Sequence, residues 1–470
     1  MNKKAGIFLR EDTIAAVATP PGRGAIAVIR LSGPRAISIG QCLFQSKGKS
    51  LTQHPRLMIH GAIVDPETQE IADEVLAAVF PAPHSYTGEE MMEIYCHGGE
   101  VVVRKILELL HRQGARFAEP GEFTFRAVRN GKMDLAQAEA VNSLIESRSQ
   151  LARALSLRML EGAFSKELGE VKEQLIAILA EVETQIEFPD DAVEAPAGSA
   201  MKSGLRLLWE RIADLKRRSI REQRFQEGIA AVLAGKPNVG KSSLFNALLG
   251  RERAIVTPHP GTTRDSIEGV VELDGKPLTL IDTAGLRETQ EEIEAIGVQR
   301  SLRLLNSSPI VLYIYDASQG LAPDDRRILD ELRKSNEQAG VILVANKYDL
   351  LKDKAISSLE DEDWTWPVIS ASAIKEGGID ALIVQLEKET ANRFPAEAGS
   401  AYLVNARQES LMSRMEERIR QAFLFLEEAS PLEIIAEELR LALQELAELD
   451  GSYSTPDIIE IVFSRFCIGK

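Results

Sequence analysis

The chain has 470 residues, of which 44% are hydrophobic, 27% charged and 5% aromatic, and its formal net charge is −16. This length is too great for one hydrophobic core, so several domains are expected, and the acidic balance argues against a surface that is basic throughout. The three cysteines are widely separated, which argues against a disulfide framework and a zinc site. No run of about 18 apolar residues indicates a membrane span, and no signal-peptide pattern is present, so we expect a cytoplasmic protein.

The first part of the chain, residues 1–131, is predicted to form a mixed α/β domain. Apolar runs at 25–31 and 75–80 are typical of strands, and the apolar spacing at 101–110 indicates a helix. Pro and Gly turn signals separate these elements. Basic and acidic side chains nearly balance in this region, so its charge does not indicate a partner.

Helical patterns dominate residues 132–226. Asp134 and Gln137 form a predicted capping box, and apolar residues then recur with the period of a helix that buries one face. A loop is predicted over 188–200, followed by a helix that ends near Glu222. The Lys and Arg residues of this last helix indicate either a solvated face or a contact with the RNA backbone, and charge alone does not decide between them.

Short apolar runs alternate with helix signals across residues 227–392. The predicted strands lie at 229–234, 278–281, 310–316, 341–345 and 368–370. This alternation predicts a parallel sheet wrapped by helices, and Asp274-Gly275 predicts one added antiparallel hairpin.

Residues 393–470 are again helical and acidic, with breaks at Pro431 and Gly451. We expect the two helical segments that flank the α/β region to pack on each other, because the apolar face of an amphipathic helix needs a partner.

The segment 235–242 reads GKPNVGKS, which fits the phosphate-loop pattern GxxxxGK[ST] between a predicted strand and a predicted helix. In such a loop the backbone N–H groups and the helix N-terminus bind phosphates. Lys241 is therefore expected to reach the β- and γ-phosphates, and the Ser242 hydroxyl is expected to bind Mg²⁺.

Three further motifs each follow a predicted strand. They are Asp282-Thr283-Ala284-Gly285, Asn346-Lys347-Tyr348-Asp349 and Ser372-Ala373. The first supplies an acidic group near the metal and a glycine near the γ-phosphate. In the second, a buried Asp349 can accept from both N1–H and the 2-amino group of guanine, which adenine lacks. The third, with Ser370-Ala371 as a less well-spaced rival, can offer an N–H to guanine O6. In this order the motifs indicate GTP.

One position departs from the pattern of Ras-like GTPases. Leu286 follows Gly285 and has no polar atom to orient the attacking water, so the acidic stretch 288–294 is expected to supply that group. Thr262 and Thr263 lie in the predicted mobile loop, where Thr263 contacts Mg²⁺ when GTP is bound.

The chain resembles the tRNA-modifying GTPase family called MnmE or TrmE over nearly its whole length. Besides the nucleotide motifs, the resemblance rests on TPPGRG at 19–24, HGG at 97–99, PGEF at 120–123, LAQAEA at 135–140 and FCIGK at 466–470. It implies an N-terminal folate-binding and dimerisation domain over 1–131, a helical domain in two parts over 132–226 and 393–470, and an inserted Ras-like G domain over 227–392.

The resemblance also implies an activity. With the FAD-dependent protein MnmG (GidA), the family installs an aminomethyl or carboxymethylaminomethyl group at C5 of the wobble uridine of certain tRNAs. The one-carbon unit comes from a tetrahydrofolate derivative, in the 5-formyl or methylene form. Members form homodimers, and K⁺-dependent pairing of their G domains stimulates GTP hydrolysis.

The resemblance also carries over several residue roles, which join the nucleotide-binding set. The K⁺ ligands would be Asn238, Thr257, His259 and Thr262, and Glu294 would orient the water. The folate pocket would be lined by Arg30, Glu93, Lys132 and Lys470, while Cys467 would serve the modification but not GTP hydrolysis. The nucleotide-binding set comprises Asn238, Val239, Gly240, Lys241, Ser242, Ser243, Thr257, Thr262, Thr263, Asp282, Thr283, Ala284, Gly285, Asn346, Lys347, Asp349, Ser372 and Ala373.

Several alternatives stay open at this point. Without the resemblance, Arg30 and Glu93 read as a structural ion pair, Lys132 as a turn lysine, and Cys467 as part of a poorly fitting prenylation box. A ribosome-assembly GTPase of the Era or EngA type would also have a hydrophobic residue after DTAG, but it leaves the N-terminal region and the FCIGK segment unexplained. A non-enzymatic scaffold that binds GTP as a switch is the third candidate.

Overall fold

The computed structural model describes residues 10–46, 48, 50–147, 149–188, 197–221, 229–250, 254–255, 267–282, 305, 308–336, 339–351, 366–393, 401–453, 462–463, 466 and 469. The chain forms two compact units. Unit 1 comprises Met1–Asn142, Met159–Ile212 and Leu411–Lys470, and unit 2 comprises Ser143–Arg158 and Ala213–Ser410. Within the described parts of the chain, no helix is long and apolar enough to cross a membrane.

The N-terminal part of unit 1 is a mixed sheet with strand order β3-β4-β5-β6-β2-β1-β7, in which only β1 and β7 pair in parallel. Its strands are β1 (Ile14–Val17), β2 (Ile26–Ser32), β3 (Phe44–Gln45), β4 (Ile59–Val64), β5 (Ile71–Phe80), β6 (Met91–His97) and β7 (Arg116–Phe117). Its helices are α2 (Ala36–Leu43), α3 (Glu100–Arg112) and α4 (Glu122–Arg129). The strands predicted at 25–31 and 75–80 and the helix predicted at 101–110 are confirmed as β2, β5 and α3.

Side-chain alternation divides this sheet into two faces. Ile29 and Ile94 point to the face covered by α2 and α3 and join one buried apolar cluster with Ile39 and Ile106. Arg30 and its direct cross-strand neighbour Glu93 therefore point to the opposite face. The alternation thus places a charged pair on the face of the sheet that α2 and α3 leave open.

Long helices form the rest of unit 1. They are α5 (Leu135–Glu146), α7 (Ala163–Glu187), α8 (Ala197–Arg218), α14 (Ala406–Glu427) and α15 (Leu432–Asp450), of which α5, α8 and α14 extend into unit 2. Helix α6 (Gln150–Leu160) belongs to unit 2 as far as Arg158. The predicted capping box starts α5, since the Gln137 N–H donates to the Asp134 side chain at 2.8 Å and the Asp134 N–H to the Gln137 side chain at 3.0 Å.

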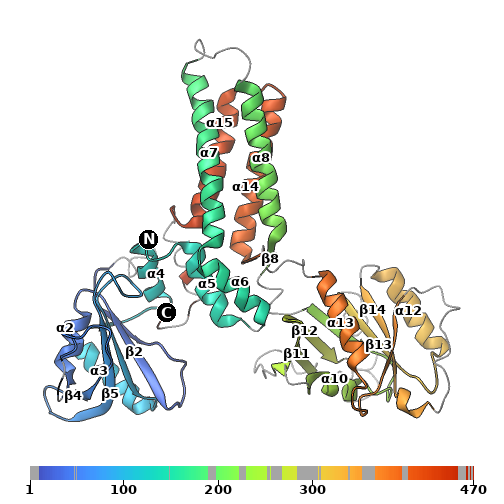
Figure 1. Cartoon of the computed structure of the whole chain (residues 1–470), viewed down its shortest axis with the longest axis horizontal. Coiled ribbons are helices and arrows are strands. Elements are labelled where there is room, and N and C mark those ends of the chain that lie inside the picture. The colour runs from blue at the N-terminus through green and yellow to red at the C-terminus, as the bar shows by residue number, and fades with distance from the viewer. Residues whose placement is uncertain are drawn as a thin grey trace, which may run out of the picture. The chain divides into compact units, whose positions relative to one another are not determined.

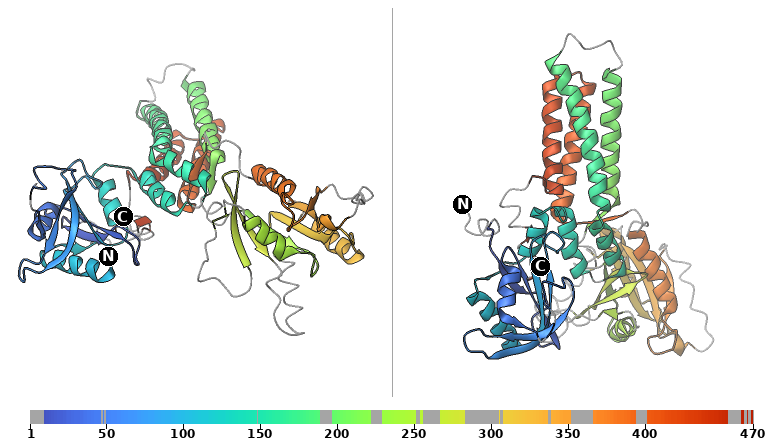
Figure 2. Two further views of the ribbon diagram at one scale, coloured as in Figure 1. Left: turned by 60° about the horizontal axis from the view of Figure 1, so that its bottom comes forward. Right: turned by 60° about the vertical axis from the view of Figure 1, so that its left-hand side comes forward.

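The predicted packing of the two helical segments is confirmed. Helices α7 and α8 lie alongside α14 and α15 (Figures 1 and 2), and their apolar faces meet in one buried cluster that includes Leu175, Leu208, Ile419 and Leu439. Residues more than 200 positions apart in sequence therefore share one core.

Two details of the helical prediction are wrong. The predicted loop over 188–200 extends too far, because α8 already begins at Ala197, and this last helix of the first segment stops at Arg218 rather than near Glu222. Residues 219–221 instead form strand β8 (Ser219–Arg221), which pairs in parallel with β16 (Tyr402–Val404). The pairing partner lies far away in sequence, so local propensity could not reveal either strand.

Five basic residues of α8 are paired with acids. Lys202 contacts Glu427 at 2.7 Å, and the Arg218 side chain donates to Asp214 at 2.7 Å. Arg206, Arg211 and Arg217 also face carboxylates. This pairing favours the solvated-face interpretation over an RNA contact.

Unit 2 contains a second sheet with strand order β10-β11-β12-β9-β13-β14-β15. Its strands are β9 (Ile229–Ala234), β10 (Ala254–Ile255), β11 (Ile267–Leu273), β12 (Lys276–Asp282), β13 (Ile310–Asp316), β14 (Gly340–Asn346) and β15 (Val368–Ala371). Its helical elements are α10 (Lys241–Leu249), α12 (Pro323–Ser335), η3 (Tyr348–Leu350) and α13 (Asp380–Arg393).

The five predicted strands of this region are confirmed as β9, β12, β13, β14 and β15, all parallel, and β11 and β12 form the predicted antiparallel hairpin. Every residue of β13 is buried, as expected for a parallel strand covered on both faces. Because parallel strands end at one edge, the loops after β9, β12, β13, β14 and β15 open at the same side of the sheet.

Candidate functional site

The phosphate loop joins β9 to α10 at this carboxyl edge. Gly235 and Gly240 adopt φ values of +139° and +95°, and a Cβ at either position would overlap with Ile314 or Asn346. The Lys241 ammonium donates to the carbonyls of Gly235 and Lys236 at 2.9 and 2.7 Å. The loop therefore holds its lysine beside the N-terminus of α10, where phosphate binding is favoured.

A hydroxyl and a carboxylate meet beside the loop. The Ser242 hydroxyl, in the first turn of α10, donates to Asp282 Oδ2 at 2.8 Å, and Asp282 is only 1% exposed at the end of β12. Oxygen ligands of this kind suit Mg²⁺, which commonly completes its shell with water and phosphate oxygens. The residues thus fit the metal that the sequence predicts at this position.

The Asn-Lys-x-Asp segment after β14 is tied directly to the phosphate loop. Asn346 Nδ2 donates to the Val239 carbonyl at 2.8 Å, and Lys347 Nζ donates to the Asn238 carbonyl at 2.7 Å. The buried Oδ1 of Asn346 has no hydrogen-bond partner among the described residues. The two motifs are therefore held as one rigid surface.

Asp349 lies on η3 and its side chain accepts from the Ser372 hydroxyl at 2.6 Å. The expectation that Asp349 is buried is wrong, since the residue is exposed. Ser372 and Ala373 follow the end of β15, whereas the rival pair Ser370-Ala371 lies inside this strand. Because the Ser372 N–H already donates to the Gly378 carbonyl at 2.8 Å, the Ala373 amide is the better candidate for a contact with a base.

Sequence reasoning missed Asp316, which ends β13 at the same edge. Its carboxylate accepts from Lys347 Nζ at 2.9 Å and from the Ser318 hydroxyl at 2.6 Å. Burial raises the pKa of Asp316, but the bonds from Ser318 and Lys347 outweigh this effect, so the net pKa is below its ordinary value. The signal for Asp316 was its place at the carboxyl end of a predicted strand.

Other predicted nucleotide, metal and catalytic residues lie outside the described residues. They are Thr257, His259, Thr262, Thr263, Thr283, Ala284, Gly285 and Glu294, and Cys467 and Lys470 of the last segment are likewise outside.

A second group of predicted residues lies on the open face of the N-terminal sheet. Arg30 donates to Glu93 Oε1 at 2.9 Å and lies 3.5 Å from the Gly469 carbonyl, so a residue of the FCIGK segment reaches this face. The Arg30 guanidinium also lies 5.3 Å from the centroid of the Tyr86 ring and 5.8 Å from that of Phe123. Arg30 is thereby held on several sides.

Three other residues of this domain differ in how they relate to the Arg30–Glu93 pair. The Tyr95 hydroxyl donates to Glu93 Oε2 at 2.7 Å, and burial together with Glu93 raises the pKa of Tyr95 to about 12, so both carboxylate oxygens are engaged. Lys132 does not join the pair: it is exposed and its Nζ donates to the Pro83 carbonyl at 3.1 Å. Burial, with a smaller effect of Asp73, raises the pKa of Cys96 to about 11, so this thiol stays protonated and inert.

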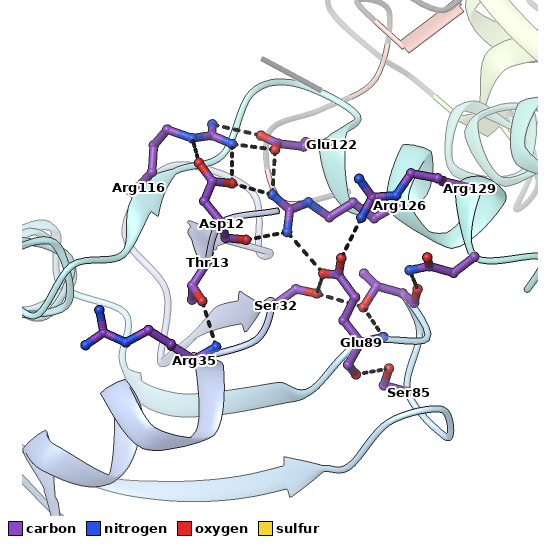
Figure 3. A network of polar contacts seen from close by, with 12 residues as sticks. Asp12, Thr13, Ser32, Arg35, Ser85, Glu89, Arg116, Glu122, Arg126 and Arg129 are labelled. Carbon is purple, nitrogen blue, oxygen red and sulfur yellow. Dashed lines mark hydrogen bonds and ion pairs between the residues drawn. The ribbon is translucent and has the colours of Figure 1, made fainter. Parts of the chain in front are cut away.

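The N-terminal domain also contains an ionic network around α4 (Figure 3). Glu122 and Arg126 are both fully buried and bond to each other at 3.0 Å, and Asp12 accepts from both Arg116 and Arg126 at 2.8 Å. Glu89 accepts from Arg126 at 3.1 Å, which fixes the segment that follows Tyr86. The network gives the PGEF motif at 120–123 a structural role, because its glutamate anchors α4.

Three features on a parallel sheet define a P-loop GTPase of the Ras-like class. They are the phosphate loop, the Ser242–Asp282 pair and the Asn-Lys-x-Asp segment. The family model described as "GTP-binding protein TrmE N-terminus" matches residues 13–132, and that described as "MnmE helical domain" matches residues 135–467. The chain therefore belongs to the MnmE (TrmE) family.

Curated relatives match the chain from end to end. A protein of Moorella thermoacetica is 40% identical over 476 residues, which cover 98% of this chain and 100% of the relative. A protein of Desulforamulus reducens is 39% identical over 464 residues, again covering 98% and 100%. Both are named tRNA modification GTPase MnmE.

Proposed function

We propose that this chain is a GTPase that acts in tRNA modification, and that with a FAD-dependent MnmG-type partner it installs an aminomethyl or carboxymethylaminomethyl group at C5 of the wobble uridine. The observation that carries the proposal is the match over 98% of the chain to relatives named tRNA modification GTPase, in a chain whose nucleotide motifs converge at one sheet edge.

GTP would lie with its phosphates along residues 235–242. The charge of Lys241 and the N-terminus of α10 face the region where negative charge develops as the bond between the β- and γ-phosphates breaks. Ser242 and Asp282, with Thr263, would hold Mg²⁺, which neutralises charge on the phosphate oxygens. The Asp349 carboxylate would accept from guanine, and the Ala373 amide would donate to O6.

Two further groups in the nucleotide site are proposed from the resemblance. Asn238, whose backbone is held by Lys347, would contribute a side-chain ligand to K⁺ together with the backbone of Thr257, His259 and Thr262. Glu294 would orient the attacking water, which Leu286 lacks the polar atoms to do.

The open face of the N-terminal sheet is the proposed site of a tetrahydrofolate derivative. A planar heterocycle carries N–H donors and ring faces, which suit the Glu93 carboxylate and the aromatic rings beside Arg30. Lys132 and Lys470 would provide positive charge for the anionic part of the folate, and Cys467 would lie beside it. The same N-terminal region is proposed to form the homodimer, in the cytoplasm.

Nucleoside mass spectrometry of tRNA tests the proposal. Cells that lack the protein should lose the 5-substituted wobble uridines, and the intact gene should restore them. A Cys467→Ser variant should hydrolyse GTP at the normal rate but fail to restore the nucleosides. Unchanged nucleosides in the deletion strain would refute the role in tRNA modification.

The ribosome-assembly alternative makes a different prediction. It expects normal tRNA nucleosides and altered ribosomal-subunit profiles in the deletion strain, because its client would be ribosomal RNA. Hydrolysis assays of the isolated protein in K⁺ and in Na⁺ test the third hypothesis, a scaffold that binds GTP only as a switch. GTP turnover in K⁺ but not in Na⁺ would exclude the scaffold.

A further inference from the structure

Helix α6 contacts the β11–β12 hairpin of unit 2 at its N-terminal end. The Leu151 N–H donates to the Gly275 carbonyl at 3.1 Å, and the Gln150 N–H donates to Glu272 Oε1 at 3.3 Å. The first N–H groups of a helix have no partner within the helix, and its N-terminus favours negative charge. The hairpin therefore caps α6 from outside.

The other end of α6 contacts the paired strands β8 and β16, which we name the clasp. Arg158 donates to the Ala401 carbonyl and to the Tyr402 hydroxyl, each at 3.4 Å, and its guanidinium lies 4.8 Å from the Tyr402 ring centroid. Arg218 lies 5.5 Å from the same centroid, and Tyr402 is 1% exposed. The clasp holds together the two stretches of chain that enter and leave the nucleotide-binding sheet.

Strand β12 connects the hairpin to the phosphate site. It begins at Lys276, next to the hairpin turn, and ends at Asp282, which accepts from Ser242. Its seven residues span about 23 Å and are paired on both sides, with β11 and with β9. A strand held in this way moves as a rigid body, so a shift of Asp282 is carried to the turn at Gly275.

We propose that α6 couples the nucleotide state to the clasp: β12 carries a change at Asp282 to the hairpin, the hairpin moves the N-terminus of α6, and Arg158 passes the movement to Tyr402. The inference rests on the proposed GTP site and adds a route by which the bound nucleotide changes the conformation of the clasp. It requires two arrangements of the hairpin contact, which GDP and GTP favour to different extents.

Amide hydrogen exchange of the full chain tests this route. In the unaltered protein, exchange at residues 219–221 and 402–404 should differ by roughly threefold or more between GDP and a non-hydrolysable GTP analogue, both with Mg²⁺ and K⁺. Glu272→Ala removes the acceptor for Gln150, and Arg158→Met removes the contact with the clasp while keeping an unbranched stem. Each should abolish the difference at the clasp but leave nucleotide protection at 235–242 intact.

Two controls sharpen the result. Asp274→Asn removes a charge from the hairpin turn at a position that is 76% exposed and contacts Lys276 at 3.6 Å, so it should preserve the response. The double variant should lose no more than either single variant, because both act through one helix. An unchanged clasp response in Glu272→Ala, or no response in the unaltered protein, would overturn the coupling. Missing protection at 235–242 would instead overturn the GTP site itself.

Discussion

Asp349 accepts a hydrogen bond of 2.6 Å from Ser372, which holds an exposed carboxylate just after β14. A carboxylate accepts two N–H bonds from guanine, whereas an asparagine amide donates one and accepts one. Xanthine carries an oxygen where guanine carries the 2-amino group, so an amide complements it.

We therefore expect Asp349→Asn to raise the KM for GTP by about two to three orders of magnitude while making XTP a substrate. Hydrolysis rates with the two nucleotides provide the measurement. Asp274→Asn, an equal charge change at a 76% exposed position in the β11–β12 turn, should alter neither nucleotide's KM. Equal losses for GTP and XTP in Asp349→Asn would show that Asp349 supports structure rather than base selection.

Arg126 is the other residue whose surroundings decide its role. It is fully buried and faces three carboxylates, those of Asp12, Glu89 and Glu122. Replacing it with methionine leaves Glu122 charged and without this partner inside the protein, so unfolding free energy should fall by about 3–5 kcal/mol. Arg129→Met removes a partly exposed contact with Glu89 and should cost at most about 1 kcal/mol. Urea denaturation of both variants gives the comparison, and equal losses would contradict the assigned burial effect.

At the scale of elements, the segment before β1 is joined to β7 and α4 by the side chain of Asp12. Burial raises the pKa of Asp12, but hydrogen bonds and charges from Arg116 and Arg126 outweigh it, so the net pKa lies below 3.8. A carboxyl group whose pKa is lowered by folding stabilises the protein above its unfolded pKa, and this contribution is lost as pH falls through the folded value.

Asp12→Asn should therefore lower the unfolding free energy by about 1 kcal/mol at neutral pH. The stability profiles of the variant and the unaltered protein should converge below pH 3.8, where the carboxylate of the latter becomes protonated. Unfolding measured across this range tests the sign. Profiles that stay parallel through the acid range would mean that Asp12 contributes through shape rather than charge.

Most strands that precede a nucleotide-binding motif could be predicted from the sequence, because the motif marks where each strand ends. In the nucleotide-binding sheet each motif follows an apolar strand, so β9, β12 and β14 could be placed from the residues that come after them. The clasp could not be placed, because strands of three residues gain their stability from each other and their pairing joins distant parts of the chain.

The residues of the candidate sites likewise include some that the sequence could predict and some that it could not. The sequence could predict Lys241, Ser242 and Asp349 because phosphate and base chemistry restrict both residue type and spacing. Tyr95 lies two residues from Glu93 on the same strand, but no motif indicates their hydrogen bond. Asp316 was marked only by its place at the end of a predicted strand, since its contact with Lys347 depends on β13 and β14 becoming neighbours. The resemblance placed Arg30 with Glu93, and the contact with the Gly469 carbonyl adds backbone support that no motif records.

For the whole molecule, the clasp explains how one domain can be inserted into another. Strand β8 leads into the nucleotide-binding sheet and β16 leads out of it, and the two pair side by side with Ser219 opposite Tyr402. The helical core formed by α7, α8, α14 and α15 draws on both flanks and contains no residue from the inserted sheet among those described. Excising the insertion should therefore leave this core complete.

We expect a chain in which residues 222–400 are replaced by a flexible linker of about 15 Gly and Ser residues to fold, because the clasp strands are parallel and the linker must run back from the end of β8 to the start of β16. The shortened chain should unfold cooperatively in urea, keep its helical circular dichroism and lose all GTP binding. Leu439→Ala in the same chain should cost about 2–5 kcal/mol, as at a fully buried leucine in an intact core. Gradual unfolding with no effect of Leu439→Ala would instead mean that the inserted domain is needed to form the helical core.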